Sequence, residues 1–172
     1  MYRFLSISVR AWVLGLFALF CFLNTSAQEA EKAVIELGPA VSRSLTEGQT
    51  GVGPTLAVEV TPIENRLELE AGITALFQSR ATEWSVDFLF KKPWIFSDRF
   101  EFMIGIGPEW VHTDAHGIKT NSIAIEVAPD FMFWHSARHR FGWYLEPMYE
   151  YKFGSPREQS LGINGGLLIG IR

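Results

Sequence analysis

The sequence contains little cysteine and has no excess of basic residues. Its 172 residues include one cysteine, Cys21, so no disulfide can form within the chain, which excludes a small disulfide-rich secreted module. The 15 Lys and Arg residues are outnumbered by 19 Asp and Glu residues, which disfavours binding to nucleic acid. A chain of this length has room for one domain, so a two-domain enzyme is also excluded.

Long apolar runs are equally scarce, and the one that is present lies near the N-terminus. Residues 11–23 are apolar, follow Arg3 and Arg10, and precede a polar segment that ends at Ala27. This order of basic, apolar and small residues predicts a secretory signal peptide over residues 1–27, with cleavage after Ala27, and the run is too short for a comfortable membrane span. We therefore expect an exported mature domain over residues 28–172 that contains no cysteine.

No helical period is visible in the mature chain, where apolar and polar residues alternate instead. This period of two is typical of strands with one apolar and one polar face. The pattern predicts eight strands, within residues 35–41, 56–61, 67–78, 84–91, 100–110, 123–133, 143–151 and 161–171.

The segments between these strands predict how the strands are connected. Residues 63–65 form a short connection, whereas residues 43–53, 112–121 and 153–159 are longer and richer in Gly, Ser, Thr and Pro. An even number of strands with such connections predicts an all-β fold, an eight-stranded antiparallel up-and-down transmembrane β-barrel with both termini on one side and the longer loops outside.

The composition of the two strand faces indicates which face points inward. The polar face carries carboxylates together with many glycines, which suit the crowded interior of an eight-stranded barrel. The apolar face carries rings such as Trp84, Phe88, Phe102 and Trp143, which suit a lipid-facing wall with aromatic girdles. The alternative is a soluble periplasmic lipocalin-like barrel that binds an apolar ligand inside.

Four segments, 90–94, 107–110, 141–147 and 158–162, carry a resemblance to a known group of proteins. Together with the eight amphipathic segments, they resemble the small outer-membrane barrels of Gram-negative bacteria, OmpA/OmpX-like in layout, and more closely a group of outer-membrane barrels with no assigned activity. The resemblance implies a location in the cell outer membrane. It also implies contacts with outer-membrane lipid and lipopolysaccharide and with the barrel assembly machinery, and no cofactor.

Strand parity assigns many charged side chains to the barrel interior. The basic residues assigned to the interior are Arg66, Arg80, Lys91, Arg99, Lys152 and Arg172. Unpaired buried carboxylates are unfavourable, so we expect a hydrated network of ion pairs and hydrogen bonds that plugs the barrel, the alternative being a path for cations or protons. The carboxylates assigned to this interior polar network are Glu36, Glu59, Glu68, Glu70, Asp87, Glu101, Glu109, Glu126, Asp130, Glu146 and Glu150.

His112, Asp114 and His116 form a candidate metal site near the end of the fifth segment. In an extended segment these three side chains share one face, with a spacing that can hold zinc or copper. The alternative is a solvated polar loop.

His135 and Ser136 invite comparison with outer-membrane enzymes that modify lipid A. Adjacent residues on a strand point to opposite faces, and these two lie in an expected inner turn, away from an outer-leaflet substrate. We therefore expect no catalytic residue and no enzyme activity, but a structural, interaction or adhesion role carried by the outer loops. A lipid A-modifying enzyme is kept as the further alternative.

Aromatic residues are absent from the first part of the mature chain. All 18 aromatic residues after the predicted signal peptide lie at or after Phe77. The wall of the first three strands is either a thinner girdle or a smooth surface that meets another protein or a second copy.

Overall fold

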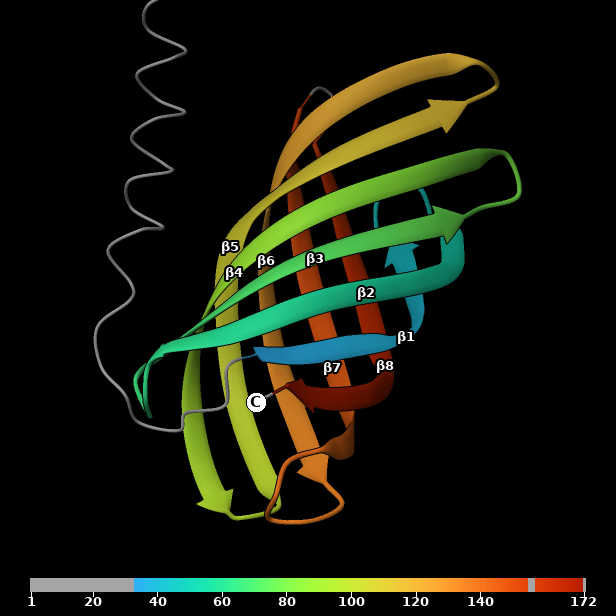
Figure 1. The fold of residues 1–172 in the computed structure, drawn as a ribbon. Helices are drawn as coiled ribbons and strands as arrows, with labels where there is room; N and C mark the ends of the chain where they lie inside the picture. The colour runs from blue at the N-terminus through green and yellow to red at the C-terminus, as the bar shows by residue number, and fades with distance from the viewer. Residues whose placement is uncertain (1–32, 155–156, 172) are drawn as a thin grey trace, which may run out of the picture.

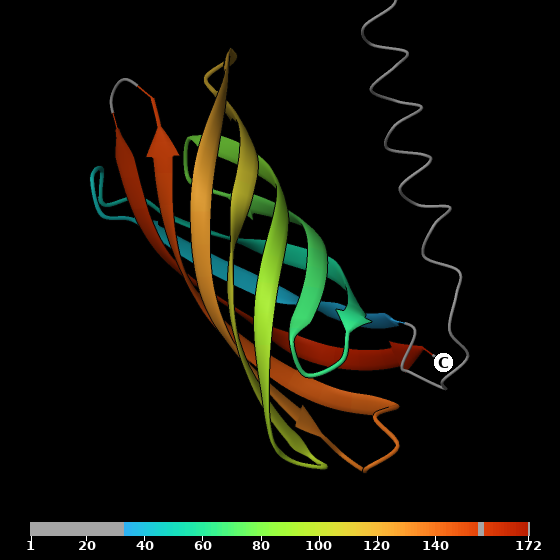
Figure 2. The ribbon, with the colours of Figure 1, turned by 90° about the vertical axis from the view of Figure 1, so that its left-hand side faces the viewer.

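The eight predicted strands form a closed antiparallel barrel. The computed structural model describes residues 33–154 and 157–171, so the predicted signal peptide and Cys21 lie outside the described residues. Each strand pairs with the next along the chain, and β8 pairs with β1, which confirms the predicted up-and-down order (Figures 1 and 2). The strands are β1 (Ala33–Ser44), β2 (Thr50–Ile63), β3 (Leu67–Phe77), β4 (Ala81–Ser97), β5 (Phe100–Ala115), β6 (Ile118–Trp134), β7 (Phe141–Phe153) and β8 (Glu158–Ile171). Among the described residues, no helix is long and apolar enough to cross a membrane.

The two ends of the barrel differ in what they carry. One end, called here the termini end, holds Ala33 and Ile171, which pair with each other, and the turns 64–66, 98–99 and 135–140. The other, called the hairpin end, holds the connections after β1, β3, β5 and β7. Figure 2 shows the β4–β5 turn projecting further at the termini end than the β2–β3 turn does.

Several predicted loops are shorter in the structure, because the strands extend into them. The loop predicted at 112–121 is a hairpin in which β5 runs to Ala115 and β6 starts at Ile118. Its two turn residues, His116 and Gly117, have φ values of 53° and 79°, as a tight primed turn requires. The connections after β1 and β7 are shorter too, and β4 continues to Ser97, beyond the predicted strand at 84–91. The prediction failed here because these strand ends are polar on both faces or apolar on both faces, so no alternation marks them.

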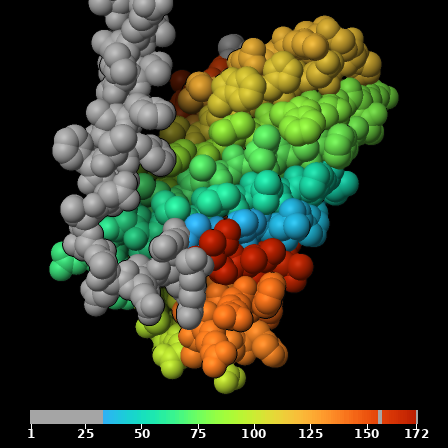
Figure 3. Space-filling model, in the orientation of Figure 1, coloured from blue at the N-terminus to red at the C-terminus, as the bar shows by residue number. Residues whose placement is uncertain are grey.

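The outside of the barrel is apolar and the inside is largely polar. Exposed side chains such as Leu56, Val86, Ile106 and Leu167 point outward, while carboxylates from the same strands are buried. Figure 3 shows the wall of neighbouring strands as a continuous surface on one side of the barrel. The alternative of a lipocalin-like barrel with an apolar ligand cavity is therefore wrong, because the faces are turned the other way.

Lys92 is a charged residue within the apolar wall. Lys92 points outward from β4, between Phe90 and Trp94. Its Nζ donates a hydrogen bond to the carbonyl of Asn65, 2.6 Å away, in the β2–β3 turn, and lies 5.5 Å from the centre of the Trp94 ring. The long side chain thus carries its charge toward the termini end, as lysines do at membrane interfaces.

The β1–β8 pairing closes the barrel through two glycines. A Cβ on Gly38 would overlap the carbonyl of Gly165, and a Cβ on Gly166 would overlap the carbonyl of Leu37. The two backbones therefore approach more closely than any larger residue allows.

Candidate functional site

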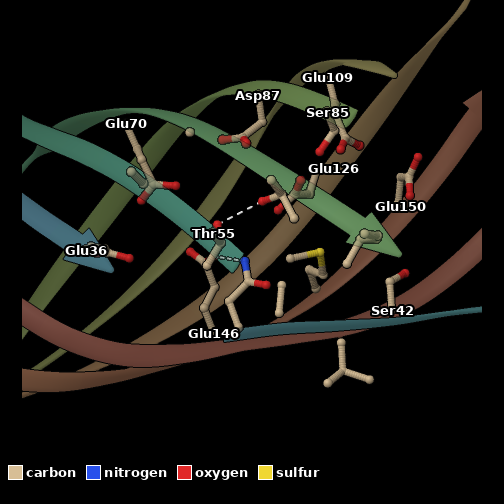
Figure 4. A pocket seen from close by; sticks show the side chains of 18 of the residues that line it. Glu36, Ser42, Thr55, Glu70, Ser85, Asp87, Glu109, Glu126, Glu146 and Glu150 are labelled. Atoms are coloured by element: carbon tan, nitrogen blue, oxygen red, sulfur yellow. Dashed lines mark hydrogen bonds between the residues drawn. The ribbon is translucent and has the colours of Figure 1, made fainter. Parts of the chain in front are cut away.

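All eleven carboxylates of the predicted interior network are buried in the barrel. Each has 9% or less of its surface exposed, and they come from every strand except β8. Figure 4 shows several of them, including Glu70, Asp87, Glu109 and Glu126, turned toward one another in an interior pocket. Strand alternation explains the burial of these carboxylates, because every second residue of a closed sheet faces the lumen.

Lys91 is the centre of the first charged cluster, which we call the Lys91 cluster. Its Nζ donates hydrogen bonds to Asp130 Oδ2 at 3.0 Å and Glu146 Oε2 at 2.9 Å, lies 3.5 Å from Glu59 Oε2, and also contacts the carboxylate of Glu70. Lys91 itself is 1% exposed. One ammonium on β4 therefore ties together carboxylates from β2, β3, β6 and β7 across the barrel.

The same carboxylates have the geometry of a cation site. One oxygen from each of Glu36, Glu59, Glu70 and Asp130 lies within 4.8 Å of the others. Oxygen ligands at such separations suit a hard cation. Because three of the four also contact Lys91, the lysine ammonium is the resident cation of this arrangement.

Lys152 organises a second charged cluster nearer the hairpin end, the Lys152 cluster. Its Nζ lies 2.8 Å from Glu83 Oε2, 3.6 Å from Glu150 Oε1 and 3.7 Å from Glu158 Oε2. The hydroxyl of Thr113 also donates to Glu83, at 3.3 Å. This cluster joins β4, β5, β7 and β8 below the mouth of the barrel.

Between the two clusters lies a stretch of interior with carboxylates but no cation. The pocket there is lined by Asp87, Glu109 and Glu126 among others, with no Lys, Arg or His in its described lining (Figure 4). Its cavity of about 20 Å³ has room for one water molecule. One oxygen of Glu109 has no hydrogen-bond partner among the described residues.

An apolar cluster closes the interior toward the termini end. Val34, Met103, Met132, Trp134, Tyr144 and Leu168 pack together there and are nearly fully buried. The ring of His139 stacks on Trp134 at 4.7 Å, so the β6–β7 connection folds back over this end of the barrel. Parity places these residues inside, but nothing in the alternation shows that the lumen changes from polar to apolar along its length.

The structure corrects the predicted positions of several basic residues. Arg66, expected in the interior network, is exposed in the β2–β3 turn, and Arg80 and Arg99 are exposed in turns as well. Arg172 lies outside the described residues. The error has one cause: alternation fixes the direction of a side chain within a strand but not in a turn. Glu83, which parity also places inside, was missed because it lies just before the recognised alternation.

The structure separates the three residues of the candidate metal site. His112 and Asp114 lie on the outer wall of β5, but the strand ends at Ala115 and His116 belongs to the turn. The extended conformation that would place all three on one face therefore holds for two of them. Metal binding here stays a prediction.

His135 and Ser136 lie in the β6–β7 connection at the termini end. The N–H of His135 donates to the Phe141 carbonyl at 2.9 Å, and the Ser136 carbonyl accepts from the N–H of His139 at 3.0 Å. Both residues thus hold the shape of the loop through their backbones.

Comparison with solved structures shows the fold. Neisserial surface protein A matches with a TM-score of 0.63 and 12% identity, over 80% of this chain and 94% of that one. The attachment invasion locus protein Ail of Yersinia pestis, solved with the heparin analogue sucrose octasulfate, matches with a TM-score of 0.55 and 11% identity, over 80% and 97% of the two chains. The N-terminal β-barrel domain of Pseudomonas aeruginosa OprF matches with a TM-score of 0.53 and 9% identity, over 81% and 98%.

No protein-family model matches the chain, and no curated protein sequence matches it.

The structural matches and the strand order show that the chain has the eight-stranded layout of the small outer-membrane barrels, as the resemblance in the sequence implied.

Proposed function

We propose that the protein is an integral outer-membrane barrel that has no catalytic role and displays its hairpin end at the cell surface. The observation that carries this proposal is the division of the wall, with an apolar exterior on all eight strands and buried carboxylates inside. Only a surrounding of lipid makes such an exterior favourable. Export through the predicted signal peptide, insertion by the barrel assembly machinery and contact with lipopolysaccharide belong to the same proposal.

We propose further that the interior acts as a plug. Along β4 and β7, the Lys152 cluster, the carboxylate pocket, the Lys91 cluster and the apolar cluster follow one another from the hairpin end to the termini end. An eight-stranded barrel has an interior that side chains can fill. The ion pairs of Lys91 cross this interior and connect strands on opposite sides of the barrel.

A role in interaction or adhesion is supported by the hairpin end. The connections after β1, β3, β5 and β7 carry polar and charged residues of both signs, among them Glu47 and Arg80, and Lys119 lies beside them at the start of β6. Two of the similar structures are a surface protein and an attachment invasion locus protein, the second bound to a heparin analogue. A rigid barrel that presents short loops suits such a role.

Two measurements, one on the purified protein and one in cells, test the proposal. Refolded into lipid vesicles, the protein should run as a compact barrel on gels and shift its mobility on heating, and in cells it should partition with the outer membrane. A protein found in the soluble fraction would overturn the membrane assignment.

In planar bilayers the plugged barrel should carry no steady current. A steady cation-selective current that Glu126→Gln abolishes would overturn the plug and favour the path for cations through the carboxylate pocket. Ser42→Ala is the matched control, because Ser42 lines the same pocket without a charge.

A further inference from the structure

A polar groove lies on the outer wall of the barrel at the hairpin end. Its lining includes Arg80, Trp84, His112, Asp114 and Lys119, from the β3–β4 turn and strands β4, β5 and β6. The strand residues among them face away from the lumen, and Arg80, in the turn, also borders the barrel mouth near Glu83 and Lys152. The groove therefore lies on the outside of these strands and is open to the surroundings of the barrel.

The strand register shows that the groove borders directly on the apolar wall. Three cross-strand rows follow one another on the outside of β4, β5 and β6. The first row is apolar, the second holds Trp84 and His112, and the third holds Asp114 and Lys119. In order, the rows are Val86, Trp110 and Ile123, then Trp84, His112 and Asn121, then Thr82, Asp114 and Lys119. The wall thus turns from apolar to polar within two rows, at a pair of tryptophans such as those found at membrane interfaces.

The groove carries more positive than negative charge. Arg80 and Lys119 are exposed, and Arg80 makes no ion pair with any residue in the described part of the chain. The one carboxylate, Asp114, lies 4.0 Å from Lys119 and accepts a hydrogen bond from the N–H of Gly117 at 3.2 Å. His112 Nδ1 is 2.9 Å from Asn121 Oδ1, and its ring stacks on Trp110.

We propose that this groove binds the phosphate of an outer-leaflet lipid, of the kind carried by the phosphorylated glucosamine headgroup of lipopolysaccharide. The proposal rests on the membrane position proposed above. Arg80 and Lys119 supply the cationic donors that phosphate oxygens prefer. Because the groove continues into the wall of Val86, Trp110 and Ile123, a ligand seated in it lays its acyl chains on apolar side chains. A soluble anion would gain nothing from this continuity, which favours a lipid as the source of the phosphate.

Titration of the detergent-solubilised barrel with lipid A tests the groove independently of membrane insertion. The Arg80→Gln/Lys119→Gln variant should bind lipid A about tenfold more weakly or worse, because two charged hydrogen-bond donors are lost. Arg66→Gln/Arg99→Gln removes two exposed charges at the termini end and should bind as the wild type does. Asp114→Asn removes the carboxylate from the groove and should bind several-fold more tightly.

Unchanged binding in the Arg80→Gln/Lys119→Gln variant overturns the proposal, as does equal weakening in the control variant. Equal affinity for dephosphorylated lipid A overturns the role of phosphate. Displacement of lipid A by an equal concentration of inorganic phosphate overturns the lipid as its source, and no displacement supports it. Failure of the wild type to enter vesicles would count against the proposed function, whereas failure to bind lipid A in detergent counts against the groove alone.

Discussion

Two adjacent lysines have opposite environments in this barrel. Lys91 is buried among carboxylates of four other strands, while Lys92 lies on the outer wall and reaches the β2–β3 turn. The two residues are chemically identical, so the difference comes only from strand alternation.

Lys91→Met should destabilise the barrel by about 3–5 kcal/mol, because it leaves the buried carboxylates of Glu70, Asp130 and Glu146 without their cation. Urea unfolding of the protein refolded into vesicles, followed by tryptophan fluorescence, measures this loss. Lys92→Met is the matched control and should have a much smaller effect. Equal destabilisation by the two variants would show that the Lys91 cluster is not what holds the interior together.

At this scale the sequence predicted which carboxylates face inward but not which of them meet. Glu36 and Asp130 are far apart in the chain and on strands that are not neighbours, yet their oxygens come within reach of one ion. Such contacts depend on the tilt and stagger of the strands around a closed barrel, which alternation along one strand does not contain. Arg66 was misplaced for the related reason that turn residues follow no alternation.

Among the strand pairings, the contact between β1 and β8 offers a test of side-chain size with a neighbouring control. Gly166→Ala should destabilise the barrel by about 1–3 kcal/mol, since the added methyl group meets the backbone of β1 and the two strands must separate. Equilibrium unfolding in vesicles measures the effect.

The neighbouring Gly165 offers a matched control for this substitution. A Cβ at Gly165 would lie 3.2 Å from the nearest atom, the carbonyl oxygen of Tyr144, so Gly165→Ala should have a smaller effect. A Gly166→Ala variant as stable as Gly165→Ala would contradict the close approach of β1 and β8.

Aromatic rings form a ladder across the outer wall near the termini end. Phe96, Phe100, Phe133 and Trp143 follow one another on β4, β5, β6 and β7, and the last pair stacks at 4.0 Å with an interplanar angle of 12°. A double-mutant cycle with Phe133→Ala and Trp143→Ala should give a coupling of about 0.5–1.5 kcal/mol beyond the separate losses. The cross-strand pair Phe131 and Leu145 has no ring stacking of its own and should give a smaller coupling. Equal coupling free energies for the two pairs would mean that ring stacking adds no stability beyond the burial of the side chains against lipid.

The strands themselves were predicted well in their centres and poorly at their ends. Alternation placed all eight strands, but it missed the extension of β5 and β6 to the turn at His116 and Gly117. Polar residues, among them Thr113, Asp114 and Thr120, occupy both faces of that hairpin. Only the register with the neighbouring strand therefore shows that this part of the chain is extended.

For the molecule as a whole, the position of the two ends predicts its orientation. With the hairpin end at the cell surface, Glu47→Cys in the β1–β2 turn should react with a membrane-impermeant thiol reagent on intact cells. Glu64→Cys in the β2–β3 turn should react only after permeabilisation. The reverse labelling pattern would invert the proposed orientation, and the wild type controls for background labelling.

Barrel closure also extends the wall that lacks aromatic rings. Aromatic residues are absent from β1, β2 and β8 and occur in β3 only at its last residue, Phe77. Because β8 pairs with β1, these four strands are contiguous, so the barrel has one side without rings and one side rich in them. The sequence predicted the first three strands of this wall, and only the closed order adds β8.

The closed strand order also dictates the sequence of events in assembly. Every pairing except one joins consecutive strands, so hairpins can form locally as the chain becomes available. The remaining pairing must bring Ala33 to Ile171 across nearly the whole domain, and the entropy of closing that loop is lost in a single step. Until then β1 and β8 are open edges able to pair with other chains. The meeting of Gly38 with Gly166 is therefore the point at which an aggregation-prone open sheet becomes a finished barrel.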